Sequence, residues 1–337
     1  MFERFQMIEK GEKIGPKLLM LSPTDFCNLN CKICWRIGKK PNFKQPPFHF
    51  FKKILREAKE LKVETIDLTG GGEPFLRKDI LDIMDLVKKF GMRGTITTNS
   101  TLIKKSDVKK VVEMKWDEIN FSLDGSTSEI NDYIRGEGIF EKVLKVVKRF
   151  EEEKNSKNVQ IPILRFCFTI TKKNFMDIPN FIKLSKSLDI RHINFSTLFE
   201  WRSNKEFWLD KKDEKDVMKK IKEGVELSKK LGIKTNLDSI LEFGVWEHQP
   251  PRFCFAPWYM LFINASEEAM VCCTLASLYK KKLGKINSLK EIWFCRKIEE
   301  LRKRMKRRVL FKECNKCLPE FTHIFNQLWD EIWNSKK

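Results

Sequence analysis

Six short apolar runs mark the N-terminal part of the chain, and longer amphipathic stretches separate them. The runs lie at residues 17–22, 64–70, 94–99, 118–124, 163–170 and 192–198. Between them, apolar residues recur at helical spacing, for example over 50–61, 80–91 and 140–153. Repeated strand–helix units predict a parallel sheet with right-handed crossovers. Six units predict an α/β fold with an open, partial (βα)6 TIM-like barrel rather than a closed eight-stranded one.

Polar and apolar residues alternate within several of these runs. In the run over 163–170, Arg165, Cys167 and Thr169 share one face and large apolar residues share the other. A filled barrel would carry bulky branched residues inside. Here the apolar face must pack against the helices, so we expect the polar face to line a cavity that holds a polar cosubstrate.

The pattern breaks near residues 243–253, where "FGVWEHQPPRF" brings a glycine and a proline pair. We therefore expect one domain over residues 1–242 and a second, small α+β domain rich in cysteine over residues 243–337. The second domain should end in a helix over residues 321–333. We expect its apolar stripe to dock onto the protein itself, and the stripe consists of Phe321, Phe325, Leu328, Ile332 and Trp333.

Charge adds a weaker indication. The chain has a formal net charge of +20, which is compatible with anionic partners such as nucleic acid, a phosphorylated substrate or a membrane surface. The excess is spread over lysine-rich helices and is typical of solvated helix faces. In the densest run, residues 301–312, apolar residues at helical spacing predict that the basic residues form an outer face. No apolar segment near the N-terminus is long enough for a signal peptide or membrane span, so we expect a soluble, cytoplasmic protein.

The cysteines point to metal chemistry rather than to disulfides. Cys27, Cys31 and Cys34 form a C-x3-C-x2-C run. A structural zinc takes four ligands, whereas three thiolates on a four-iron cluster leave one iron with an open position. A zinc site completed by a distant histidine remains an alternative. A redox pair at Cys31 and Cys34 is another, although it leaves Cys27 unexplained.

The stretch "TDFCNLNCKICW", residues 24–35, resembles the signature of the radical S-adenosylmethionine (radical SAM) superfamily. The resemblance implies that these three cysteines hold a 4Fe–4S cluster whose open site binds SAM. It implies reductive cleavage of SAM to a 5′-deoxyadenosyl radical, which abstracts a hydrogen atom from the substrate. It also implies a low-potential electron donor of the ferredoxin or flavodoxin type.

Further motifs resemble the SAM-binding parts of that family over residues 17–200. "TGGGEP" resembles the segment that contacts the SAM amino group, and "NDYIRG" resembles a motif whose arginine pairs with the carboxylate. Asn131 stands where the family usually has histidine. Ser122 and Asp124, at the end of the fourth strand, are placed to bond the ribose or the carboxylate. The resemblance thus implies a SAM-binding set of Gly71, Gly72, Glu73, Asn99, Ser122, Asp124 and Arg135.

A second cysteine group resembles the C-terminal auxiliary-cluster domains called SPASM and twitch. The expected ligands of one auxiliary 4Fe–4S cluster are Cys254, Cys272, Cys314 and Cys317. Cys272 is preferred to the adjacent Cys273 by register. The chain departs from the family at the hairpin, where "SEEA" replaces a glycine turn. A structural zinc held by the same four thiolates stays open, because C-x2-C suits it equally well.

These features predict a radical SAM enzyme, of oxidoreductase type, that oxidises, epimerises or rearranges a small molecule or peptide. Few residues precede Cys27, so we expect no extended N-terminal peptide-binding domain. Cys167 is a candidate hydrogen donor to a substrate radical, with a bland buried cysteine as the alternative. Position alone suggests the candidate bases Glu200, Asp238, Glu242 and His248. An RNA-modifying radical SAM enzyme, and a non-enzymatic zinc or iron–sulfur module, remain as alternatives.

Overall fold

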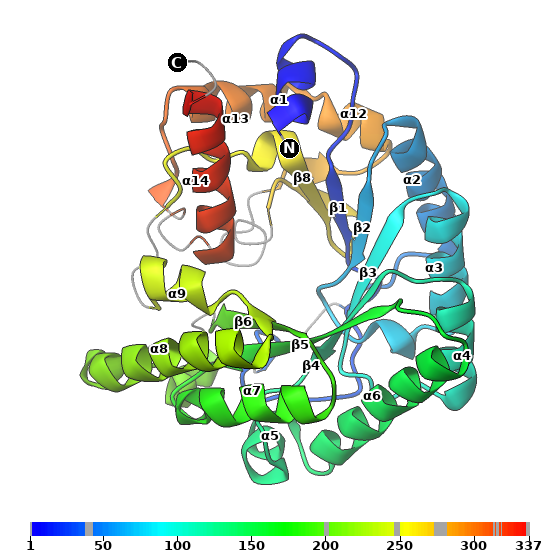
Figure 1. The fold of residues 1–337 in the computed structure, drawn as a ribbon. Helices are drawn as coiled ribbons and strands as arrows, with labels where there is room; N and C mark the ends of the chain where they lie inside the picture. The colour runs from blue at the N-terminus through cyan, green and yellow to red at the C-terminus, as the bar shows by residue number, and fades with distance from the viewer. Residues whose placement is uncertain are drawn as a thin grey trace. The chain divides into compact units, whose positions relative to one another are not determined.

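The structure is a computed structural model. It describes residues 2–37, 43–198, 202–245, 250–272, 282–312, 314, 317 and 319–334. The chain divides into two compact units. The first comprises residues 1–26, 43–95 and 247–337, and the second comprises residues 27–42 and 96–246. Figure 1 labels the elements of both.

The first unit is built on strands from both ends of the chain. They are β1 (Leu18–Leu21), β2 (Thr65–Leu68), β8 (Met260–Ile263), β9 (Glu268–Met270) and β10 (Gly284–Lys285). Their hydrogen-bonded order is β10-β9-β8-β1-β2, and β3 (Arg93–Thr98) follows β2. Strand β1 is parallel to both β2 and β8, so Leu19 lies between Ile66 and Leu261. The pattern of apolar runs had not indicated that a C-terminal strand pairs with β1.

Helices surround these strands. They are α1 (Phe2–Glu9), α2 (Phe48–Glu60), α3 (Ile80–Lys89), α10 (Ala256–Tyr259), α12 (Leu289–Trp293), α13 (Arg296–Lys306) and α14 (Pro319–Asn334), with a 3-10 turn η1 (Pro74–Leu76). Helices α2 and α3 lie along β1 and β2 in Figure 1. Helix α2 shows why: its buried residues Phe51, Ile54, Leu55 and Ala58 follow the helical repeat.

The second unit contains the end of β3 and the strands β4 (Glu118–Ser122), β5 (Ile163–Ile170), β6 (His192–Thr197) and β7 (Lys234–Thr235). They lie in the order β3-β4-β5-β6-β7, and the pairs from β4 to β7 are parallel. Its helices are α4 (Lys105–Glu113), α5 (Ser128–Arg135), α6 (Ile139–Ser156), α7 (Ile178–Ser187), α8 (Glu214–Leu231) and α9 (Leu237–Phe243), with 3-10 turns η2 (Phe175–Asp177), η3 (Arg202–Phe207) and η4 (Lys211–Asp213).

The six predicted strands and the predicted two-faced strands are confirmed. Strand β5 alternates between half-buried and buried residues along its whole length. Its apolar side packs on α7, where the Phe168 ring lies 4.7 Å from the Phe181 ring, and Phe168 also lies 5.4 Å from the ring of Phe195 on the neighbouring strand β6. Arg165, Cys167 and Thr169 occupy the other, half-buried side. The α/β fold with a parallel, partial barrel is therefore as the sequence indicated.

The hairpin of β8 and β9 explains how this chain manages without a turn glycine. Glu267 takes the positive φ of 61° that a glycine would take more easily. Asn264 supports the turn, because its Oδ1 accepts from the backbone N–H groups of Ser266 at 3.0 Å and Glu268 at 2.9 Å. The two hydrogen bonds of the Asn264 side chain therefore stabilise a turn conformation that glycine would adopt without strain.

Helix α14 confirms the expected docking stripe as far as its side chains are described. Phe325 and Leu328 are buried, and the Phe325 ring lies 6.0 Å from the Phe255 ring. The side chains of Ile332 and Trp333 lie outside the described residues. The helix therefore uses its apolar face to complete the core of the first unit.

Helix α13 departs from its predicted all-basic outer face at one position. Arg302 is 3% exposed, its Nε donates to the Pro257 carbonyl at 3.1 Å, and it lies 5.0 Å from the Trp293 ring. It stands four residues after Ile298, which is also buried, so it shares the inward stripe. Arg302 was predicted on the solvent face because it is charged, although its position in the helical repeat is on the inward stripe.

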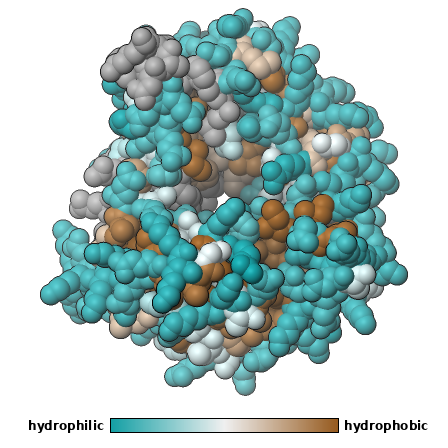
Figure 2. All heavy atoms as spheres, viewed as in Figure 1, coloured by the Kyte–Doolittle hydropathy of each residue, from teal (hydrophilic) through white to brown (hydrophobic). Residues whose placement is uncertain are grey.

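The described helices also bear on membrane insertion. None of them combines the length and the apolar character that crossing a bilayer requires. On the face drawn in Figure 2, hydrophilic residues predominate over the surface of each unit, and apolar residues appear in small groups.

Candidate cysteine sites

In the first unit, the glycine run after β2 is fitted to the segment that leads into the cysteines. The N–H of Gly72 donates to Thr24 O at 2.7 Å, and the N–H of Glu73 donates to Phe26 O at 2.8 Å. A Cβ at Gly72 would stand 1.8 Å from Phe26 O, and Gly71 has a φ of +68°. Glycine is therefore required for close approach of two backbone segments. The pair fixes the residues directly before the first cysteine.

Glu73 has a local partner of its own. Its side chain is 2% exposed, and it accepts from the N–H of Phe75 at 3.0 Å, which caps the 3-10 turn η1. The predicted contact of Glu73 with a SAM ammonium group remains a prediction. The structure supplies a second, structural reason for an acidic residue at this position.

In the second unit, the cysteine loop, residues 27–37, docks onto the C-terminal end of α5. The N–H of Lys32 donates to Ile134 O at 2.8 Å, and the Cys31 Sγ lies 3.8 Å from Arg135 O. The last carbonyls of a helix lack intrahelical partners, so α5 offers acceptors that the loop can use. The helix end thus fixes the middle cysteine of the three.

Asn99, which follows β3, holds the first cysteine. Its Nδ2 lies 3.8 Å from Cys27 Sγ and donates to Asn28 Oδ1 at 3.0 Å, while its Oδ1 accepts from the N–H of Thr101 at 3.0 Å. The sequence had suggested Asn99 as a SAM contact. The structure shows it bonded to the cysteine loop.

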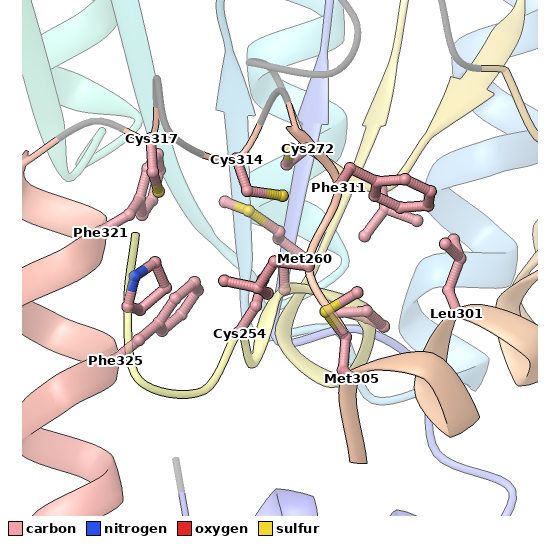
Figure 3. A pocket seen from close by; sticks show the side chains of 15 residues that line it. Cys254, Met260, Cys272, Leu301, Met305, Phe311, Cys314, Cys317, Phe321 and Phe325 are labelled. Atoms are coloured by element: carbon pink, nitrogen blue, oxygen red, sulfur yellow. The ribbon is translucent and has the colours of Figure 1, made fainter. Parts of the chain in front are cut away.

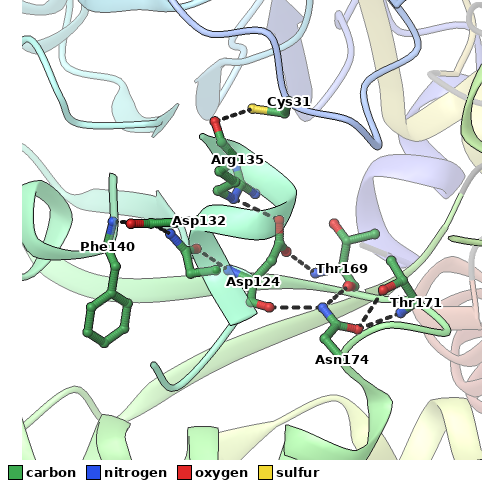
Figure 4. Close-up of polar contacts among 9 residues, drawn as sticks. Cys31, Asp124, Asp132, Arg135, Phe140, Thr169, Thr171 and Asn174 are labelled. Atoms are coloured by element: carbon green, nitrogen blue, oxygen red, sulfur yellow. Dashed lines mark hydrogen bonds and ion pairs between the residues drawn. The ribbon is translucent and has the colours of Figure 1, made fainter. Parts of the chain in front are cut away.

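A buried ion pair lies behind the middle cysteine, as Figure 4 shows. Arg135 Nε stands 2.7 Å from Asp124 Oδ2, and Asp124 is completely buried. Asp124 Oδ1 accepts from the N–H of Thr169 at 2.7 Å, and its backbone is bonded by the Asn174 and Asn131 side chains, each at 3.0 Å. Sequence reasoning missed Asn174, because no local pattern marks it.

Burial and charge set the state of the thiols in the cysteine loop. Burial raises the pKa of Cys31 to about 11; Arg135 acts against this shift, whereas Cys34, Asp124 and Cys27 add to it. Burial also raises the pKa of Cys34. Cys31 and Cys34 must therefore lose a proton to bind a metal. No three His, Cys, Asp or Glu side chains in the described part of the chain form a preformed site for a bare metal ion. As donors, three mutually interacting thiols suit an iron–sulfur cluster.

Ser122 and Cys167 lie side by side on the polar face of the second unit's sheet. Cys167 is opposite Ser122 on β4 and Asn194 on β6, and all three are half-buried. Burial lowers the pKa of Arg135, but Asp124, Cys31 and Cys167 together raise it above its usual value. Cys167 is therefore within electrostatic reach of the same arginine as Cys31.

The second cysteine group lines one cavity of the first unit, shown in Figure 3. Cys254, Cys272, Cys314 and Cys317 all border this space of about 50 Å³. We call it the four-cysteine cavity. The other labelled side chains around it are Met260, Leu301, Met305, Phe311, Phe321 and Phe325. Four thiols in an apolar lining suit a fully ligated iron–sulfur cluster or zinc.

Burial keeps the free Cys254 thiol of this cavity protonated. Burial raises the pKa of Cys254 to about 12, with Cys314 adding to the shift and the N–H of Ala256 opposing it. The N–H of Cys317 donates to Cys314 O at 3.0 Å, which forms the compact C-x2-C turn. Cys273, the alternative to Cys272, lies outside the described residues. Cys295 starts α13 and does not line the cavity.

The candidate bases gain little from the structure. Asp238 forms an exposed ion pair with Lys229 at 3.0 Å, and Glu242 is exposed. Glu200 and His248 lie outside the described residues. Neither described carboxylate is marked as a base by its surroundings.

Comparison with known proteins matches two parts of the chain to known domain families. Residues 21–184 match the radical SAM superfamily, and residues 254–318 match the SPASM iron–sulfur cluster-binding domain. Fe-coproporphyrin III synthase of Methanosarcina barkeri is 32% identical over 173 residues, which are 51% of this chain and 41% of the synthase. The chain spans about half the length of the curated relatives that it matches.

Solved structures agree on the fold. SuiB of Streptococcus suis, crystallised with S-adenosylmethionine, has a TM-score of 0.69 and 19% identity, covering 88% of this chain and 70% of SuiB. SuiB has also been crystallised with its precursor peptide SuiA. Native anSMEcpe with bound AdoMet has a TM-score of 0.67 and 20% identity, covering 90% of this chain and 86% of anSMEcpe. A radical SAM domain binds a 4Fe–4S cluster and SAM, and a SPASM domain binds auxiliary iron–sulfur clusters. The chain thus contains a radical SAM domain, followed by a SPASM-type iron–sulfur cluster-binding domain.

Proposed function

We propose that this radical SAM enzyme uses Cys27, Cys31 and Cys34 to bind its catalytic cluster and acts on a small molecule or a peptide. The observation that carries the proposal is the anchoring of the cysteine loop. Asn99 lies against Cys27, and the end of α5 lies against Cys31. Two of the three thiols thus have protein contacts that hold them in position, which lowers the ordering cost of binding.

When bound, the cluster and SAM supply a 5′-deoxyadenosyl radical that abstracts a hydrogen atom from the substrate. The chain's own residues bind and orient. We propose that Arg135 pairs with the SAM carboxylate, with Asp124 as the positioning residue that holds the guanidinium in place. The remaining proposed SAM contacts are Gly71, Gly72, Glu73, Asn99 and Ser122.

For the C-terminal part we propose an auxiliary-cluster domain over residues 243–337, following a radical SAM domain over residues 1–242. Cys254, Cys272, Cys314 and Cys317 would ligate the auxiliary cluster. The apolar lining of the four-cysteine cavity supports this, because a dry surrounding favours retention of a cluster whose ligands are all thiolates.

The net reaction we propose is an oxidation, epimerisation or rearrangement, with a low-potential ferredoxin or flavodoxin as electron source. Epimerisation would require a hydrogen donor, and Cys167 is the proposed one, since it lies on the half-buried polar face within electrostatic reach of Arg135. In that case Cys167→Ala should release 5′-deoxyadenosine but no epimerised product. Full product formation by this variant would exclude the donor role.

The test of the proposed function is anaerobic reconstitution, with iron and sulfide counted per chain before dithionite and SAM are added. About eight irons, together with release of 5′-deoxyadenosine, is the expected result. About four irons plus zinc, with 5′-deoxyadenosine still released, would retain the enzyme and make the four-cysteine site structural. Zinc alone with intact SAM would overturn the proposal.

A further inference from the structure

The second half of α13 and the residues after it are strongly basic. Residues 301–312 contain seven Lys and Arg residues and no Asp or Glu. Arg302 is buried, but most of the others are exposed. Lys306 pairs with Glu9. Lys303 and Arg307, both exposed, have no carboxylate within ion-pair distance in the part of the chain that the structure describes.

A surface hollow of about 390 Å³ lies beside this segment, within the same unit. Its charged lining consists of Lys282, Lys297, Glu300 and Arg304. Its apolar lining includes Val271, Leu301 and Phe311, and these three residues also line the four-cysteine cavity. One layer of side chains therefore borders both the charged hollow and the cysteine cavity.

Two of the cations in this hollow are not neutralised by a described carboxylate. Lys282 pairs with Glu268 at 2.7 Å, and Glu300 pairs with Arg296 at 2.8 Å. By contrast, Lys297 donates only to a backbone carbonyl, at 2.8 Å, and Arg304 donates to another at 3.2 Å. Carbonyl oxygens orient these side chains but leave their charges uncompensated.

We propose that the hollow and the exposed face of α13 form the docking surface of an acidic, one-electron carrier protein. This rests on the proposed function, in which the four cysteines hold a redox centre. Carboxylates of the carrier would face Lys297 and Arg304 in the hollow and Lys303 and Arg307 outside it. A partner seated in the hollow is separated from the cavity by the layer of side chains that borders both. Electron transfer requires a carrier to bind close to the redox centre, whereas binding of nucleic acid does not.

The test uses the full-length protein, both as purified without clusters and after reconstitution. A fluorescently labelled acidic flavodoxin and a labelled acidic 2Fe–2S ferredoxin are the probes, and binding is followed by anisotropy. At least one probe should bind at low salt, and its Kd should rise about tenfold between 50 and 200 mM salt. The variant Lys303→Glu/Arg307→Glu should weaken binding a further tenfold or so.

The matched control is Lys215→Glu/Lys219→Glu on α8, which makes the same change in net charge at two exposed positions. Binding should change by less than about threefold. Equal weakening by both double variants would overturn the proposal, because attraction would then follow net charge alone. Absence of binding by both carriers at 50 mM salt would also overturn it, as would tRNA binding that is lost in Lys303→Glu/Arg307→Glu while neither carrier binds.

Dithionite-driven cleavage of SAM is measured in parallel: its failure rejects the proposed function, whereas normal cleavage without carrier binding rejects only the docking surface.

Discussion

The two cysteine sites use the same ligand atom in opposite surroundings. The cysteine loop has polar neighbours: Asn99 at Cys27, and the α5 terminus and the Asp124–Arg135 pair behind Cys31. The four-cysteine cavity is lined mainly by methionine, leucine, proline and phenylalanine side chains. One site thus has three thiols among charges, and the other has four thiols in an apolar lining.

This difference indicates what each site can accept. Three thiolates leave an iron for a further ligand, and nearby ionic groups can bind a charged cosubstrate such as SAM. Four thiolates in dry surroundings satisfy a cluster completely, so the site has no vacancy for chemistry. The number of cysteines and the polarity of their surroundings therefore agree at both sites.

The largest expected effect is loss of radical chemistry from one site only. Cys31→Ala should abolish release of 5′-deoxyadenosine, with a drop of about a thousandfold or more. The reason is that the proposed catalytic cluster loses one of its three cysteine ligands. Cys314→Ala should lose about half of the bound iron but retain cleavage of SAM. Iron counting and chromatography of 5′-deoxyadenosine measure both effects. Cys295→Ala, outside both sites, should behave as wild type; equal loss of cleavage in the first two variants would contradict distinct roles.

The next effect concerns two arginines, one near each site; Arg302 is buried and Arg135 is partly buried. Arg135→Met leaves the fully buried Asp124 without its partner, and should lower the free energy of unfolding by about 3–5 kcal/mol. Arg302→Met leaves Glu299, whose side chain is 49% exposed and can be solvated. Its loss should be nearer 1 kcal/mol. Denaturant unfolding of both variants measures the difference, and equal losses would show that the Asp124 charge is not the cause.

The sequence predicted the elements and the chemistry better than the contacts. Six strands and the cysteine groups could be read because strand alternation and cysteine spacing are local patterns. The pairing of β8 with β1 could not, since it joins residues more than two hundred positions apart. Asn174 was missed for the same reason, since its partner Asp124 is fifty positions away. Arg302 was missed because its charge favoured the solvent face over its place on the inward stripe. For Asn99, the residue was identified, while its observed contact, with the cysteine loop, was not foreseen.

A smaller effect should follow from filling the backbone contact before the cysteine loop. Gly72→Ala would place a methyl group 1.8 Å from Phe26 O, so the two segments must separate, at a cost of about 1–3 kcal/mol. Iron retention in the cysteine loop should fall, while zinc or iron in the four-cysteine cavity should not. The control Gly11→Ala has a positive φ to accommodate, which Gly72→Ala does not, but nothing lies within 4 Å of its new methyl group. If Gly11→Ala lowers iron retention equally, close packing at Gly72 is not responsible.

The smallest effect tests whether the polar face of the second unit is as water-poor as its partial burial indicates. Burial, and then Arg165 and Lys234, lower the pKa of His192 below its ordinary value of 6.5. The unfolded chain therefore binds this proton more readily than the folded one, so its contribution to stability is complete above pH 6.5 and is lost as pH falls through the folded pKa. Comparing unfolding free energies at about pH 7.5 and about pH 5.5, wild type should lose slightly more than His192→Gln, by a fraction of a kcal/mol because the ring is half-buried. If wild type and His192→Gln lose the same unfolding free energy, water reaches His192 freely. The difference in polarity between the two cysteine sites would then be a property of the residues next to the thiols and not of the wider polar face.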